Sequence, residues 1–118
     1  MSTHASSTVE RHFTRIPPQL RAIYQRLLTR VADFGPFEEV PKQASIHLQR
    51  GTVFADIQLR KAYFNLEFNS DYAIDHPRIT KQLQLSAHRF AYTIKIESAT
   101  DIDNQVLKWL KNAYDLCK

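Results

Sequence analysis

Hydrophobic and polar residues alternate along this chain with two different periods, which separate predicted helices from predicted strands. In Pro18–Val31 the apolar residues recur every three or four positions, the spacing of one buried helix face. Gly35 and Pro36 follow, and this pair is typical of a helix end because proline cannot continue the helix. We therefore predict a long amphipathic helix that begins at Pro18 and ends before Gly35.

Further along, apolar residues occupy every second position, which predicts strands with one apolar and one polar face. Three such runs cover residues 45–49, 53–60 and 63–69, and a fourth covers 89–97. Only short connections, such as the turn signal at residues 50–52, separate the first three runs. We therefore expect these three strands to form an antiparallel meander.

The remaining segments carry weaker patterns. Residues 70–88 connect the third and fourth strands, and Pro77 in their middle resembles the start of a short helix over residues 77–83. Ser98 or Thr100 is expected to cap a second long helix that ends near Leu116. Residues 7–10 fit a capping box before a short helix that reaches Phe13. Residues 1–7 are expected to form a disordered tail.

These elements predict an α+β fold with two layers. We expect a four-stranded, mainly antiparallel sheet, with a long helix before it and another after it, both packed on one face. The chain has no internal repeat and no low-complexity linker, so residues 8–118 are expected to form a single domain.

Composition limits the classes of protein that the chain can represent. With 118 residues, 43% of them hydrophobic, the chain has enough apolar surface for a folded core. No apolar run approaches the roughly 18 residues of a membrane span, so we expect no membrane partner. Residues 1–8 lack the apolar core of a secretory signal, and the single cysteine, Cys117, cannot form an internal disulfide. A cytoplasmic location is therefore expected.

The basic charge of the chain is spread along its length. The formal net charge is +4, and residues 1–59 and 60–118 each contribute +2. Only residues 11–30 are locally basic, because this stretch contains five arginines and no aspartate or glutamate. A solvated helix face and a phosphate-binding stripe both explain this run, and the solvated face is the simpler interpretation.

The alternation of the strands predicts one polar sheet face with both charged and aromatic residues on it. Such a face can stack bases or dock a flat partner, or it can simply be solvated and carry cross-strand ion pairs. Asp56 and Glu67 would repel the phosphate backbone of a nucleic acid. A large apolar side chain such as Phe54 on a solvated face often marks a contact with a partner or a loop that covers the face, and residues 70–88 could form such a loop. The candidate ligand-binding residues are His47, Phe54, Asp56, Arg60, Tyr63, Glu67, Arg89 and Lys95.

Sequence patterns for cofactors and known catalytic groups are absent. The five histidines do not pair with ligands at metal-binding spacing, and both glycines are assigned to turns, so no phosphate loop remains. The nuclease pattern of a carboxylate followed by an acidic-x-Lys strand fails because Asn69 stands where lysine is needed. We therefore expect no metal, no cofactor and no recognisable catalytic residues.

Several segments together resemble one bacterial family, domain of unknown function 5655. The resemblance covers most of the chain, in the order and spacing of the segments 8–13, 18–21, 31–36, 44–59, 101–104 and 109–114. Some members carry a cysteine-bearing, zinc-ribbon-like segment or occur beside nuclease-like domains, but this chain has no such segment. The resemblance therefore implies the fold and leaves the activity open.

From these observations we expect a small, non-enzymatic binding domain. Its ligand is nucleic acid, a small anion or a protein partner. The alternative is an enzyme with an acid-base site around His47, Asp56 and Glu67, which would require these groups to converge in a pocket. A third hypothesis is a homodimer formed through the polar face or through an exposed strand edge, so both a monomer and a homodimer are considered.

Overall fold

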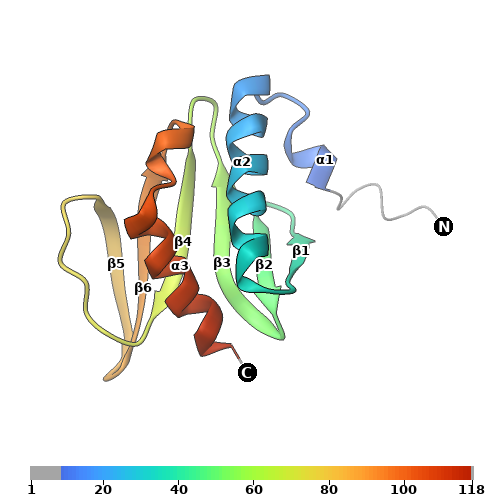
Figure 1. The fold of residues 1–118 in the computed structure, drawn as a ribbon. Coiled ribbons are helices and arrows are strands. Elements are labelled where there is room, and N and C mark those ends of the chain that lie inside the picture. The colour runs from blue at the N-terminus through green and yellow to red at the C-terminus, as the bar shows by residue number, and fades with distance from the viewer. Residues whose placement is uncertain (1–8, 118) are drawn as a thin grey trace.

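Six antiparallel strands form one sheet in the computed structural model, which describes residues 9–117 (Figure 1). The order across the sheet is β1-β2-β3-β4-β6-β5, so β1 and β5 are its two edges. The strands are β1 (Glu38–Pro41), β2 (Ile46–Arg50), β3 (Thr52–Leu59), β4 (Phe64–Ser70), β5 (Ile79–Ser86) and β6 (Arg89–Ile96). The predicted α+β class and the antiparallel sheet are confirmed.

Two long helices, α2 (Pro18–Val31) and α3 (Asn104–Leu116), cover one face of the sheet, as Figure 1 shows. Their apolar stripes meet the apolar strand residues in one core, in which the rings of Trp109 and Phe68 stack 5.5 Å apart. No helix of residues 9–117 lies over the second face of the sheet. The two-layer architecture therefore leaves one side of the strands open, as the alternating pattern predicted.

The α2 helix begins at Pro18 as predicted, and a 3-10 turn, η2 (Ala32–Phe34), extends it before Gly35. Gly35 has a φ of 140°, and a Cβ at this position would lie 2.5 Å from the hydroxyl oxygen of Tyr114. That hydroxyl donates a hydrogen bond to the carbonyl oxygen of Pro36 at 2.8 Å. Glycine is therefore required both by the backbone conformation and by the close approach of α3.

The sheet has six strands where four were predicted, because β1 and β5 were missed. The helix predicted over residues 77–83 is wrong, since residues 79–86 form β5. Pro77 lies in a turn, closed by a hydrogen bond from the Ile79 amide to the His76 carbonyl at 3.0 Å. The backbone amide of Arg78 also donates to His76 Nδ1 at 3.2 Å. The apparent helix start is therefore the turn that leads into β5.

The final helix begins later than predicted. Ser98 caps only a 3-10 turn, η3 (Ala99–Asp101), in a capping box with Asp101. Asp103 is the N-cap of α3 and accepts a hydrogen bond from the Val106 amide at 3.0 Å. At the other end of the chain, α1 (Val9–His12) matches the predicted short helix. The proposed cap at residues 7 and 8 and the predicted tail lie outside the described residues.

Residues 71–78 run along the helix side of the molecule and do not fold over the polar face. The ring of His76 packs edge-on against Trp109 of α3, with centroids 5.1 Å apart. Arg78 donates to the Asp103 carboxylate at 3.3 Å and to the Asp101 carbonyl at 2.9 Å. These contacts attach residues 76 and 78 to α3, on the side of the sheet opposite the polar face, so this part of the connection is not the covering loop considered for Phe54. No helix within residues 9–117 has both the length and the apolar character that a membrane span requires.

Candidate functional site

The polar side of the sheet, which we call the open face, presents a row of register partners across its strands. His47 on β2 lies opposite Asp56 on β3, and Asp56 lies opposite Glu67 on β4. The row continues from Glu67 to Thr93 on β6 and from Thr93 to Lys81 on β5. The sheet therefore brings together His47, Asp56 and Glu67, as the alternation predicted.

Hydrogen bonds link the two carboxylates of this row through one amide. The side-chain nitrogen of Gln58 lies 3.1 Å from Asp56 Oδ2 and 3.3 Å from Glu67 Oε1, and it donates to both. Two carboxylates on neighbouring strands repel each other, and a shared neutral donor reduces but does not cancel this repulsion. We call Asp56, Glu67 and the bridging Gln58 the carboxylate cluster. It concentrates negative charge at the centre of the open face.

His47 lies at the edge of the carboxylate cluster. Its Nε2 is 3.6 Å from Asp56 Oδ1, within ion-pair range, and both side chains are about one-quarter exposed. The Nδ1 atom of His47 and the Oδ1 atom of Asp56 are buried, and neither has a hydrogen-bond partner in the part of the chain that the structure describes. Buried polar atoms without partners cost free energy.

Tyr63 and Lys95 form a second group on the open face. The ammonium of Lys95 lies over the Tyr63 ring, 4.7 Å from its centroid, in cation–π geometry. Lys95 also lies opposite Asn65 on β4, at the end of the sheet where β3 turns into β4. These two predicted site residues therefore come together beside the carboxylate cluster, where they form a cationic rim.

The two predicted arginines lie outside this arrangement. Arg60 follows the end of β3, is exposed, and donates to the carbonyl of its neighbour Leu59 at 3.1 Å. Arg89 is exposed at the start of β6 and lies opposite Ser86. It is six residues from Lys95 along the strand, a separation of about 20 Å at the usual rise per residue. Within residues 9–117, neither arginine forms an ion pair with Asp56 or Glu67.

Phe54 belongs to the core, so its assignment to the open face is wrong. The register passes from Ala55 opposite Leu48 to Val53 opposite Gln49 and skips Phe54, which marks a β-bulge. The bulge turns the Phe54 side chain toward the helices, where it is fully buried. Its ring packs edge-on against those of two aromatic residues, Phe37 at 6.3 Å and Tyr114 at 5.3 Å.

Two residues of the open face escaped the sequence analysis. Gln58 occupies a polar position of the predicted strand over residues 53–60, but only the side-chain geometry reveals that it bridges two carboxylates. Lys81 was missed because β5 was assigned as helix, although its register against Thr93 adds a cation to the row. Alternation could have identified the position of Gln58 and could not have identified its role.

The open face is suited to recognition of polar groups. It has acceptor oxygens at its centre and a cationic rim beside them. Within residues 9–117, no three His, Cys, Asp or Glu side chains are grouped so that they could hold a metal ion. Four hollows lie elsewhere on the surface, and their linings include neither His47 nor Asp56. The arrangement can bind a partner that donates hydrogen bonds or carries positive charge.

Comparison with known proteins identifies the family of this chain. A family model described as a domain of unknown function, DUF5655, matches residues 9–117. No curated protein and no solved structure matches. The match spans every described helix and strand. The chain therefore belongs to the domain of unknown function 5655 family.

Proposed function

We propose that this protein is a non-enzymatic binding domain whose open face binds a protein partner that presents arginine or lysine side chains. The observation that carries the proposal is the carboxylate cluster, with two carboxylates held side by side by Gln58. A guanidinium group can donate to two carboxylate oxygens at once, so such a pair suits an arginine. The helices leave this face uncovered, so an extended segment can reach the cluster.

The charge of the open face favours a protein over nucleic acid. Binding of a nucleic-acid backbone requires clustered cations, because each contact neutralises a phosphate. Here the centre of the face is acidic, and of the two predicted arginines Arg60 follows the end of β3 while Arg89 lies at the start of β6, so they form no cluster of cations. Tyr63 is the one aromatic side chain of the predicted set that remains on this face, and Lys95 covers its ring. These features support a cationic protein segment as the ligand.

A peptide titration followed by NMR tests the proposal. A short glycine peptide with two arginines should shift the backbone amide signals of β2, β3 and β4 around residues 47, 56 and 67. Glu67→Gln removes one carboxylate and preserves size, and it should weaken peptide binding about threefold to fivefold, the effect of one exposed ion pair. Glu97→Gln is a matched control, since it removes the same charge from an exposed residue beyond the end of β6.

Two further ligands decide between the partner classes. The same peptide with glutamates in place of arginines should leave these signals unchanged. A single-stranded oligonucleotide at low salt should also leave them unchanged. Stronger shifts on the open face with the oligonucleotide than with the arginine peptide would contradict a protein ligand. An equal effect of Glu67→Gln and Glu97→Gln would contradict the assignment of the site.

An acid-base enzyme is the second candidate, because His47 lies within ion-pair range of Asp56. A catalytic pair usually operates in a cleft that excludes water, whereas the His47 and Asp56 side chains are each about one-quarter exposed on a sheet face that neither α2 nor α3 covers. The binding function is therefore preferred.

We also propose a cytoplasmic location, since the free thiol of Cys117 requires no oxidising compartment. A monomer and a homodimer are both compatible with an accessible open face.

A further inference from the structure

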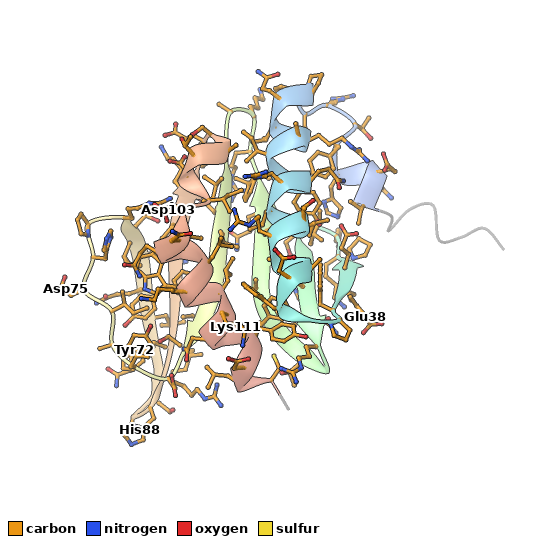
Figure 2. All side chains as sticks on the ribbon, viewed as in Figure 1. Glu38, Tyr72, Asp75, His88, Asp103 and Lys111 are labelled. Atoms are coloured by element: carbon orange, nitrogen blue, oxygen red, sulfur yellow. The ribbon has the colours of Figure 1, made fainter. Side chains whose placement is uncertain are left out.

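A groove between the two helices lies on the side of the molecule opposite the open face. It has a volume of about 510 Å³ and is lined by Arg30, Asp33, Phe34, Asn104, Leu107, Lys108 and Lys111. The α3 residues among these recur at helical spacing, so they form one stripe along the side of α3. Figure 2 shows Lys111 on the side of α3 toward α2. The volume falls within the range typical of small-molecule sites.

The charge of the groove is predominantly positive. Arg30, Lys108 and Lys111 face one carboxylate, that of Asp33. Both carboxylate oxygens of Asp115 hold the Lys111 ammonium at 2.8 Å, whereas the side chains of Arg30 and Lys108 have no ion pair within residues 9–117. Arg30 is also only partly exposed. A half-buried guanidinium without a partner is costly, and a bound anion would offset that cost.

The position of Arg30 also distinguishes it within the arginine run of residues 11–30. Arg21 pairs with Glu10 and lies over the Phe13 ring, 5.0 Å from its centroid. It therefore fastens α1 to α2. Arg30, in the last turn of α2, instead lines the groove. The run is neither a uniform solvated face nor a continuous phosphate-binding stripe.

The groove has an apolar part beside its cations. Phe34 and Leu107 line it, and both are partly buried against the core. The Phe34 ring is fixed by Tyr114, with centroids 5.7 Å apart. A flat apolar group can pack on these two side chains while an attached anion reaches the cations. The Asp33 carboxylate adds an acceptor for a hydroxyl or amino group on the same ligand.

We infer that this groove is a binding site for a small phosphate ester with an aromatic ring and hydroxyl groups, the chemistry of a mononucleotide. The phosphate pairs with Arg30 and Lys108, the ring packs on Phe34 and Leu107, and Asp33 accepts a hydrogen bond from the hydroxyl-bearing part. This site is separate from the open face, so it does not depend on the proposed protein partner.

Calorimetric titration with adenosine monophosphate tests the inference, with adenosine and inorganic phosphate as partial ligands. Adenosine monophosphate should bind at least about tenfold more tightly than either fragment, since only it uses both parts of the groove. The combined variant Arg30→Ala, Lys108→Ala should lose at least about tenfold in affinity. Arg30→Lys keeps the charge and should retain most of the affinity, which separates loss of charge from loss of folding.

Lys61→Ala provides the matched control, because it removes one exposed cation from the turn between β3 and β4, away from the groove. It should leave the affinity for adenosine monophosphate unchanged. The inference is overturned if adenosine monophosphate does not bind at low salt. It is equally overturned if phosphate alone binds as well, or if Lys61→Ala weakens binding as much as Lys108→Ala does.

Discussion

At the scale of single residues, Tyr24 is the buried ionisable group with the clearest effect on stability. Its ring is fully buried in α2, and its hydroxyl donates to Glu39 Oε2 of β1 at 2.6 Å. Burial raises the pKa of Tyr24 far above its ordinary value, and the hydrogen bond to the Glu39 carboxylate raises it further. The tyrosine therefore stays protonated in the folded protein where it would ionise in the unfolded chain.

This difference predicts a loss of stability at high pH. Because the folded-state pKa is the higher one, the stabilisation is fully present below about pH 10 and declines by about 1.4 kcal/mol per pH unit above it. Tyr24→Phe should reduce the free energy of unfolding at neutral pH by about 1–2 kcal/mol, through loss of the hydrogen bond. The same variant should flatten the decline above pH 10, measured by urea unfolding at several pH values.

Tyr72→Phe serves as the control for this measurement, since Tyr72 is 46% exposed. It should change neither the neutral-pH stability nor the high-pH decline by a comparable amount. If Tyr24→Phe leaves the decline as steep as in the unaltered protein, the difference in ionisation between the folded and unfolded states does not arise at Tyr24.

Phe54 shows where residue patterns stop predicting side-chain direction. Strict alternation places it beside Asp56 on the open face, because each residue of a regular strand points opposite to its neighbour. One extra residue in β3 reverses that parity for Phe54 and leaves Asp56 in place. A bulge depends on how Phe54 packs against Phe37 and Tyr114, residues distant from it in the chain. Local sequence contains no sign of that contact.

At the scale of elements, the central strands were predictable and the two edge strands were not. β2, β3, β4 and β6 each place apolar side chains in the core at alternate positions, which gives their sequences a two-residue period, although β6 also buries Ala91 and Thr93. No residue of β1 or β5 is fully buried, so no such period is imposed on them. In β5, register shifts on either side of the central residues further weaken the alternation. The missed strands are therefore those that the core does not constrain.

Because β5 lies at the exposed edge of the sheet, we expect it to be less stable against local opening than the central strands. Its outer backbone groups pair with no strand in the described residues, and Leu83 and Leu85 are more than half exposed. Few buried contacts hold such a strand in place, so it opens more readily than the centre of the sheet. Amide hydrogen exchange should be at least about tenfold faster in β5 than in β4, which pairs on both sides.

Because the exchange rates of β4 and β5 are measured in the same molecule, β4 serves as the internal reference. The exchange is best measured at the lowest protein concentration that the method allows, because a second copy of the chain could pair with the β5 edge. Equal protection of β4 and β5 under these conditions would contradict an unpartnered edge. Protection of β5 that grows with concentration would identify that edge as the homodimer contact considered from the sequence.

At the scale of the whole molecule, the sheet separates two surfaces of different charge. The open face has the carboxylate cluster at its centre, and the helix side has the groove with three cations. The net charge of +4 does not reveal this separation, because residues 1–59 and 60–118 each contribute +2 and each half supplies residues to both surfaces. The division follows the layers of the fold and not the order of the sequence. Sequence alone could place the charged residues on strands or helices but could not assemble the groove.

Because the apolar core lies between them, the two surfaces should behave independently. Glu67→Gln and Lys108→Ala change opposite sides of the sheet and share no contact, so their effects on the free energy of unfolding should add within about 0.5 kcal/mol. Chemical denaturation of both single variants and the double variant measures this. In the binding assays, Lys108→Ala should leave the arginine-peptide affinity unchanged, and Glu67→Gln should leave the adenosine monophosphate affinity unchanged. A non-additive double variant, or an effect of either change on the opposite ligand, would show that the sheet transmits a conformational change between its faces.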